Sequence, residues 1–256
     1  FFSLLYSGTN WLIEILSLIH SKGDPKWIQE VPSWDRFPWV ETTVGYASLS
    51  DHKGPRMYTS HLPIQLFPKS FFSSKAKMIY CIRNPRDVVV SAYAFWKKMT
   101  IIKTPETFDK FIEHFLQGNV IYGSWFEHVR GWLSMREREN VLVVSYEELK
   151  KDIRRTVEKI CEFLEKKLKP EEIDSVIKYS SFQFMKGNKM SNYSLLPSSF
   201  FTENFALIRK GVTGDWKNHF TVAQAEAFDE IYQEKMKGYS PNLFPWETEN
   251  CTVPEC

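Results

Sequence analysis

The 256-residue sequence lacks a long uninterrupted apolar run, which argues against a signal peptide and against a membrane-spanning helix. Residues 1–20 form the most apolar stretch, but Asn10 and Glu14 interrupt it, and neither a basic leader nor a small-residue cleavage site flanks it. We therefore predict neither a signal peptide nor a membrane-spanning helix. Because the first residue is Phe1 and not Met, we expect a processed, partial or alternatively started product.

A strong net charge is also missing. The formal charge of +2 is too small to indicate a nucleic acid as a partner, so any anion site must be local. The four cysteines show no metal-ligand spacing, and no acidic cluster suggests a metal. Cys81 lies in an apolar strand pattern and is expected to be a buried free thiol, which favours a reducing, cytoplasmic location.

Internal repeats and low-complexity tracts do not occur, and short apolar runs alternate with amphipathic segments. This alternation predicts an α/β fold of three layers, in which a central, mainly parallel sheet is flanked by helices. The length suits one large domain, so we assign residues 1–256 to a single domain with a C-terminal tail from about residue 247.

Periodicity and turn signals place the individual elements. Apolar residues three and four apart predict a first helix from Trp11 to about Ile19, with Gly23 as its C-cap. Pro85 suits the first turn of a helix that continues to Trp96. We further predict strands at 56–60, 77–82 and 141–144, helices at 107–120, 121–132, 153–164 and 171–179, a last helix opened by a capping box at Thr221, and irregular segments at 24–55 and 184–210.

Four polar residues follow predicted strands: Ser7, His61, Arg83 and Tyr146. In an open parallel sheet, ligands bind at this edge, so we expect these side chains to share a site. His61 is a candidate general base, although a lone histidine is more often structural. Arg83 could pair with a phosphate or with a carboxylate such as Asp87.

The segment Ser7-Gly8-Thr9-Asn10-Trp11 joins an apolar run to the first helix. A strand, a tight turn with glycine and a helix together direct backbone N–H groups at a phosphate. Ser91, one turn into the next helix, faces back toward Arg83, and Arg209-Lys210-Gly211 adds two cations beside a glycine. Each also has an ordinary interpretation. Ser91 could be a neutral serine within a helix, and Arg209 and Lys210 could be a solvated basic pair.

Taken together, these motifs resemble the cytosolic sulfotransferases, in the hydroxysteroid and bile-salt branch. The resemblance extends to about Trp246 and rests on residues 7–11, 27–29, 60–77, 83–87, 145–148 and 209–218. It implies a P-loop-like sulfotransferase fold and a role in steroid, bile acid and lipid metabolism. It also implies transfer of a sulfuryl group from 3′-phosphoadenylyl sulfate (PAPS) to an alcohol, which leaves adenosine 3′,5′-bisphosphate (PAP) and requires no metal.

The resemblance also implies roles for single residues. His61 matches the general base. The nucleotide site matches Ser7, Gly8, Thr9, Asn10, Trp11, Arg83, Ser91, Tyr146, Ser180, Phe182, Met185, Arg209, Lys210 and Gly211. The acceptor pocket would be lined by Trp34, Trp39, Phe95, Trp96 and Tyr193. A homodimer is implied through Lys217, Thr221, Val222 and Glu226.

Tyr6 departs from the family pattern, which has a lysine here that contacts the leaving oxygen. A tyrosine hydroxyl donates a hydrogen bond but brings no charge, and loss of one preorganised donor typically costs ~3–4 kcal/mol. The resemblance further implies a segment before this loop that the given sequence does not contain, so we expect an N-terminally shortened domain.

Three hypotheses follow. The first is an active alcohol sulfotransferase, and the second is an impaired homologue that binds nucleotide or steroid or pairs with intact subunits. The third, a P-loop nucleoside triphosphatase, is disfavoured because the Gly-x-x-x-x-Gly-Lys loop and a magnesium-binding aspartate after a strand are absent.

Overall fold

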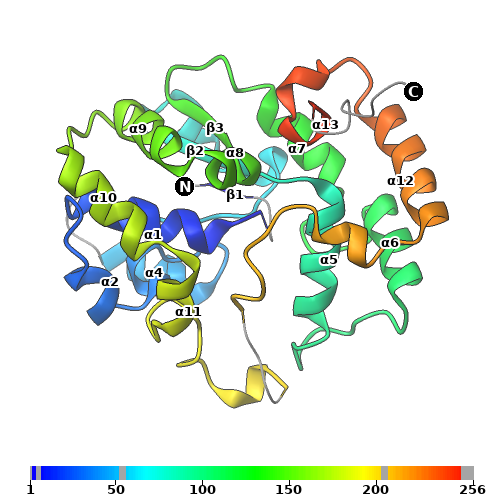
Figure 1. Ribbon diagram of the computed structural model, residues 1–256, viewed down its shortest axis with the longest axis horizontal. Helices are drawn as coiled ribbons and strands as arrows, with labels where there is room; N and C mark the ends of the chain where they lie inside the picture. The colour runs from blue at the N-terminus through cyan, green and yellow to red at the C-terminus, as the bar shows by residue number, and fades with distance from the viewer. Residues whose placement is uncertain (1, 4–6, 52–55, 203–206, 249–256) are drawn as a thin grey trace, which may run out of the picture.

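The computed structural model describes residues 2–3, 7–51, 56–202 and 207–248 (Figure 1). Within these residues, three strands form one parallel sheet in the order β1 (Phe2–Ser3), β2 (Met78–Ile82), β3 (Val141–Ser145). Met78 pairs with Val141 and Ile82 with Ser145. The predicted strands at 77–82 and 141–144 and the parallel arrangement are thus confirmed.

Side chains of the central strand β2 contribute to two separate hydrophobic clusters. Met78, Tyr80 and Ile82 belong to one hydrophobic cluster, and Ile79 and Cys81 belong to the other. Successive side chains of a strand point to opposite faces, so both faces of the sheet are buried. The three-layer prediction is therefore confirmed.

Each core is closed by its own helices (Figure 1). One layer contains α1 (Thr9–His20), α9 (Ile153–Phe163) and α10 (Pro170–Tyr179). The opposite layer contains α5 (Pro85–Trp96), α6 (Phe108–Gln117), α7 (Trp125–Leu133) and α12 (Val222–Lys235).

Helix starts follow the local capping chemistry. Pro85 occupies the first position of α5, where its missing N–H costs nothing, and the Asn84 side chain caps the helix by accepting from the backbone N–H of Arg86. Reciprocal capping boxes start α8 (Tyr146–Lys151) at Ser145 and α12 at Thr221, which confirms the capping box predicted at Thr221.

The helix predicted at 121–132 begins later, at Trp125. Tyr122 and Gly123 have φ angles of 68° and 78°, in the left-handed region that a right-handed helix cannot include. The side chain of Ser124 then caps α7 by accepting from the backbone N–H of Glu127. Because Tyr122 contacts the ring of His61, this turn also bears on the site described below.

The prediction of a long irregular segment at 24–55 was wrong for its described part. It contains α2 (Lys26–Glu30), α3 (Ser33–Arg36) and α4 (Thr43–Asp51). Pro25 and Pro32 directly precede the first two of these helices, so prolines that suggested a loop in fact mark helix starts. Residues 52–55 lie outside the described residues.

The strand predicted at 56–60 was also wrong. Residues 56–58 are irregular, and within 56–60 only Thr59, which pairs with Trp39 in an isolated parallel bridge, and Ser60 are bridge residues. Pro63 ends any extension, and the backbone before it bonds mainly to side chains, as shown below. Within the described residues, His61 therefore follows two bridge residues and not a continuous strand.

The remaining segments are short. Residues 184–210, predicted to be irregular, overlap α11 (Phe182–Gly187) and one 3₁₀ turn, Ser198–Phe200. The other 3₁₀ turns are Ile64–Leu66, Lys69–Ser73, Asp215–Asn218 and Pro241–Leu243, and a final helix, α13, spans Pro245–Thr248. Residues 249–256 of the expected C-terminal tail lie outside the described residues.

Cys81 is a buried free thiol, as predicted, and Cys161 is another. None of the helices in the described part of the chain has the length and apolar character that a bilayer crossing requires.

Candidate active site

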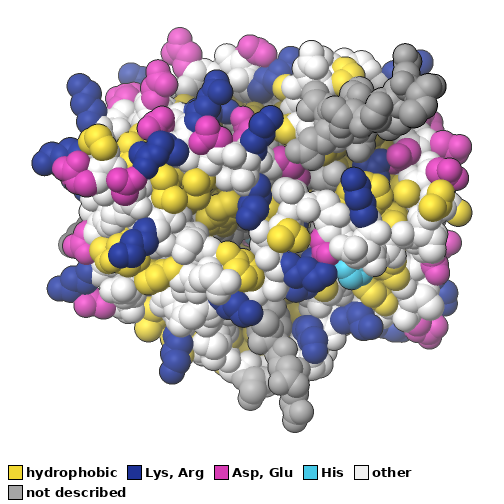
Figure 2. Space-filling model, viewed as in Figure 1, with side chains coloured by type: hydrophobic (Ala, Val, Ile, Leu, Met, Phe, Trp, Pro, Cys, Tyr) yellow, Lys and Arg dark blue, Asp and Glu magenta, His cyan; other side chains and the backbone are white. Residues whose placement is uncertain are grey.

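A cavity of about 420 Å³ opens where β2 and β3 end. It is lined by the start of α1, the side chains that follow β2 and β3, one face of α5, the start of α11 and residues 207–212. Figure 2 shows hydrophobic side chains in a hollow near the middle of one face, among scattered basic and acidic ones. The cavity brings together residues that are far apart in sequence.

The chain turns at Gly8 directly before α1. Gly8 has φ 97°, and a Cβ at this position would lie 2.6 Å from Cδ2 of Tyr146. Ser7 is fully buried, and its hydroxyl has no hydrogen-bond partner among the described residues. Its carbonyl accepts a hydrogen bond from Sγ of Cys81 at 2.9 Å, which ties the loop to the sheet. The departure at Tyr6 lies outside the described residues.

Arg83 leaves the end of β2 and is buried at the cavity wall. Its guanidinium carbon lies 4.2 Å from the centroid of the Tyr146 ring. It donates to Oγ of Ser91 at 3.2 Å and to the carbonyl of Val212 at 3.0 Å. The predicted proximity of Arg83 and Ser91 is therefore present, and Arg83 also bonds to Val212.

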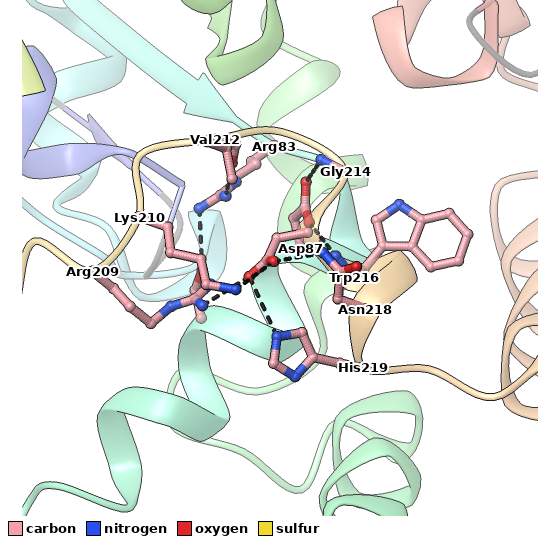
Figure 3. A network of polar contacts seen from close by, with 11 residues as sticks. Arg83, Asp87, Arg209, Lys210, Val212, Gly214, Trp216, Asn218 and His219 are labelled. Carbon is pink, nitrogen blue, oxygen red and sulfur yellow. Dashed lines mark hydrogen bonds and ion pairs between the residues drawn. The ribbon is translucent and has the colours of Figure 1, made fainter.

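Asp87 instead anchors the turn after the basic pair (Figure 3). Its two carboxylate oxygens accept from the backbone N–H groups of Gly214 at 2.7 Å and Trp216 at 2.9 Å. The turn is thereby held against α5, and this fixes the residues that precede it at the cavity wall.

Arg209 and Lys210 both form ion pairs with the buried carboxylate of Asp215, each at 2.7 Å (Figure 3). Burial would raise the pKa of Asp215, but hydrogen bonds from Lys210, Asn218 and Arg209 outweigh it and hold the pKa well below its usual range. The side chains of Arg209 and Lys210 remain 30% and 47% exposed. Asp215 thus gathers two accessible cations at the cavity.

Aromatic rings form the wall between these cations and the phosphate loop. Trp11 and Tyr146 meet edge to face at 5.4 Å, and the indole N–H of Trp11 has no hydrogen-bond partner among the described residues. Gly211 has φ 67°, and a Cβ there would collide with the ring of Phe182. Two glycines therefore allow two aromatic rings to approach the loops. Ser180 and Met185, predicted at the same place, also line the cavity.

His61 reaches the same cavity from the segment before Pro63 and is 2% exposed. Its ring packs edge to face on Trp39 at 4.9 Å and lies 5.5 Å from the ring of Tyr122. A histidine between two aromatic rings has a restricted orientation, which a proton acceptor requires.

Two of the five predicted acceptor residues, Trp39 and Phe95, line the cavity. Trp96 does not: it packs on Phe111 at 5.2 Å in the core behind α5, because adjacent helix residues point about 100° apart. Trp34 and Tyr193 are also outside the lining.

Trp34 and Tyr193 pack on each other at 5.1 Å behind Asn10. The Tyr193 hydroxyl donates to Oδ1 of Asn10 at 3.0 Å, and therefore supports the start of α1 from behind.

Sequence reasoning missed six lining residues. They are Ala94, Lys98, Lys150, Leu207, Ile208 and Val212. Helical spacing could have found three of these: Ala94 and Lys98 are three and seven residues beyond Ser91, and Lys150 is four beyond Tyr146. Lys150 Nζ also lies 5.7 Å from the centroid of the Trp11 ring, which places another cation at the cavity.

The described residues contain no group of three or more His, Cys, Asp or Glu side chains that could hold a metal ion. They do fit an anionic adenine nucleotide. The orphaned buried hydroxyl of Ser7 and the glycine turn after it suit a phosphate, the cations 209–210 suit a second one, and Trp11 offers an aromatic face.

Comparison with known proteins assigns the family. The sulfotransferase domain family matches residues 3–240. The 3-alpha-hydroxysteroid and 3-beta-hydroxysteroid sulfotransferases of Cavia porcellus are each 71% identical over 241 residues, covering 94% of this chain and 84% of each relative. Sulfotransferase 2A1 of Homo sapiens is 63% identical over 241 residues, covering 94% and 85%. The chain therefore belongs to the sulfotransferase family, in the branch that contains these hydroxysteroid enzymes.

Comparison with solved structures supports the same assignment. Mouse sulfotransferase SULT7A1 complexed with PAP has a TM-score of 0.80 and 30% identity, covering 97% of this chain and 86% of its own. Retinol dehydratase in complex with androsterone and PAP has a TM-score of 0.84, covering 94% and 82%, and at 23% identity it supports the fold alone. PAPS is accordingly the co-substrate and PAP the product. The alternative of an impaired homologue gains no support from these comparisons.

Proposed function

We propose that the chain transfers the sulfuryl group of PAPS to the hydroxyl of a steroid, a bile acid or a similar apolar alcohol. One observation carries this proposal. A single cavity is lined by the phosphate loop, by Arg209 and Lys210, and by His61 between aromatic walls. The nucleotide and the acceptor can therefore meet in one cavity, which is what direct group transfer requires.

The cavity residues divide by chemistry. Gly8 to Trp11, with Ser7 behind them, would receive the 5′-phosphosulfate, and Arg83, Ser91 and residues 209–211 would hold the 3′-phosphate. The adenine would lie among Trp11, Tyr146, Ser180, Phe182 and Met185. Trp39 and Phe95 would contact the acceptor, with Trp34 and Tyr193 supporting the start of α1.

His61 acts as the general base in this proposal. An imidazole nitrogen of His61 accepts the acceptor's hydroxyl proton as the oxygen attacks sulfur and the bond from sulfur to the phosphate oxygen breaks. The negative charge that leaves with PAP is stabilised by the loop N–H groups and the nearby cations. Burial between Trp39 and Tyr122 keeps the ring in place and limits access of water.

The class of acceptor is inferred from the aromatic walls of the cavity and from the named hydroxysteroid sulfotransferases. Two relatives of equal identity are named for the 3-alpha and the 3-beta hydroxysteroid, so the resemblance favours a steroid without choosing the configuration. The test is transfer of labelled sulfur from PAPS to both 3-hydroxysteroid epimers, a bile acid and a simple phenol. Rapid sulfation of a steroid or bile acid, with slow reaction of the phenol, is expected; a preference for the phenol would contradict the acceptor class.

We also propose a cytosolic homodimer that uses Lys217, Thr221, Val222 and Glu226. Val222 supports this, because it is 75% exposed at the start of α12 and an apolar side chain gains from being covered. Val222→Glu should shift the sedimentation coefficient to that of a monomer, and an unchanged value would contradict this interface.

A further inference from the structure

We propose that His128 on α7 is a positioning residue that fixes the backbone of His61 and thereby the direction of its imidazole. This inference rests on the proposed role of His61 as the base. His128 does not line the cavity and is 1% exposed, so it acts through His61 and not on the substrate.

Helix α7 presents two ring N–H donors to the segment that carries His61. Nε2 of His128 lies 3.1 Å from the carbonyl oxygen of His61, and Nε1 of Trp132 donates to the carbonyl oxygen of Leu62 at 3.1 Å. His128 and Trp132 are four residues apart and therefore share one face of the helix. Two consecutive carbonyls of an irregular segment are thus held by one rigid element.

The hydrogen bonds fix which nitrogen of His128 carries the proton. A carbonyl oxygen only accepts, so Nε2 must be protonated to donate to His61. Nδ1 is then an acceptor, and the hydroxyl of Tyr80 lies 2.9 Å from it and donates. Tyr80 is fully buried on β2. Two hydrogen bonds therefore connect the sheet to the His61 backbone through the ring of His128.

Burial keeps this arrangement in one protonation state. Desolvation lowers the pKa of His128 to about 4, against the opposing hydrogen bond to the His61 carbonyl. The ring is therefore neutral at pH 7, and Nδ1 stays available to Tyr80. The lowered pKa gives a neutral ring, and the hydrogen bonds described above assign its proton to Nε2.

Side-chain partners hold the segment at residues 60–62, which is not part of a continuous strand in the described structure. On its other side, Glu41 accepts from the backbone N–H of His61 and from Oγ of Ser60 at 2.7 Å. The peptide groups on both sides of His61 are thereby fixed, one through Glu41 and one through His128. A displacement of a reacting group by about 1 Å can cost on the order of a hundredfold in rate. Loss of the hydrogen bond from either Glu41 or His128 to the His61 backbone should therefore reduce turnover.

The test compares His128→Leu, which removes the donor, with His128→Gln, whose amide N–H can replace Nε2–H. For the leucine variant, kcat should fall by ~10- to 100-fold while the dissociation constant of PAP changes by less than about twofold. The glutamine variant should recover most of kcat. Val129→Ala is the matched control, because it removes a buried α7 side chain that packs in the same core without bonding to residues 60–62.

Two measurements keep the inference testable if His128→Leu does not fold. Trp132→Phe keeps a ring but removes the neighbouring donor, and should lower kcat with unchanged PAP affinity. Nitrogen-15 spectra of the histidines, assigned with His128→Gln, should show one ring that stays neutral and protonated at Nε2 down to about pH 5. A ring at this position that titrates near pH 6.5 would overturn the inference.

The outcomes also separate this inference from the proposed function. If His61→Ala is inactive but His128→Leu keeps its full kcat, or loses kcat and PAP affinity together with no recovery in His128→Gln, the positioning role is wrong and the base assignment stands. If His61→Ala still transfers sulfate, the base assignment fails and the positioning role fails with it.

Discussion

Gly8 and Tyr146 are in such close contact that a single methyl group would not fit between them. A Cβ on Gly8 would lie 2.6 Å from Cδ2 of the ring, well inside van der Waals contact. The two residues are far apart in sequence: Gly8 directly precedes α1, and Tyr146 directly follows β3. Their contact therefore sets how closely the loop before α1 approaches the aromatic wall of the cavity.

We expect Gly8→Ala to weaken PAP binding by at least ~10-fold, which corresponds to about 1.4 kcal/mol. The new methyl group must displace Tyr146 or the loop, and φ 97° adds backbone strain. Gly238→Ala is the matched control, because Gly238 has φ 94° with no atom within 4 Å of its Cβ position. Calorimetric titration with PAP should show weakening only at Gly8; equal affinities would contradict the contact.

Arg209→Ala should weaken PAP by ~10- to 100-fold, because a charge-assisted hydrogen bond contributes about 1.5–3 kcal/mol. Adenosine 5′-phosphate, which lacks the 3′-phosphate, should lose less than about twofold. Arg154→Ala is the control, since Arg154 on α9 pairs with Asp174 on α10 and neither residue lines the cavity. Equal weakening of both nucleotides would show that Arg209 does not hold the 3′-phosphate.

Phe95 and Trp96 are adjacent in sequence, but their substitution should affect different properties. Phe95 lines the cavity, so Phe95→Ala should raise the acceptor KM by ~10-fold or more, in line with about 1.5–3 kcal/mol for burying such a ring. Trp96 is in the core, so Trp96→Ala should lower the free energy of unfolding by about 3–5 kcal/mol. Denaturant melts and steady-state kinetics of both variants check this; an acceptor KM altered equally by both would contradict the assignment.

Glu147 should make stability depend on pH. Burial raises its pKa to about 7, although the backbone N–H of Asn84 donates to the carboxylate at 3.0 Å. The native state then binds more protons than the unfolded state between about pH 4.5 and 7, so this contribution to stability is lost as the pH rises through that range. Relative to Glu147→Gln, the wild type should lose about 3 kcal/mol of unfolding free energy across it.

The comparison with Glu147→Gln is needed because His128 acts with the opposite sign. Its pKa is lowered to about 4, so its contribution grows as the pH rises from about 4 to 6.5. The glutamine can still accept from Asn84, which isolates the charge. A difference between the two proteins that does not vary with pH would contradict a buried, titrating Glu147.

The sequence predicted strands β2 and β3 and the glycine turn before α1 from local signals, whereas residues such as Ser180, Phe182 and Met185 were placed at the nucleotide site by the family resemblance. Apolar runs define β2 and β3, and a glycine before a helix defines the loop at Gly8. Every predicted nucleotide residue except Ser7 lines the cavity, and Ser7 lies buried directly behind it.

Long-range pairings could not be predicted in this way. The prolines at 25 and 32 indicate a loop or a helix start equally well, and only packing on α1 decides between them. Phe95 and Trp96 look alike in sequence, while the helix phase that separates them depends on the core. Likewise, nothing local indicates that Asp215 gathers two cations or that His128 bonds to His61.

The most direct test of the account is transfer of labelled sulfur from PAPS to a 3-hydroxysteroid by the wild type and by His61→Ala, with PAP affinity measured on both. We predict that the wild type transfers sulfate, that His61→Ala loses at least ~100-fold of this rate, as expected for a general base, and that both bind PAP within about twofold. A His61→Ala variant that transfers sulfate at the wild-type rate, or that loses PAP affinity in parallel with the rate, would contradict the account.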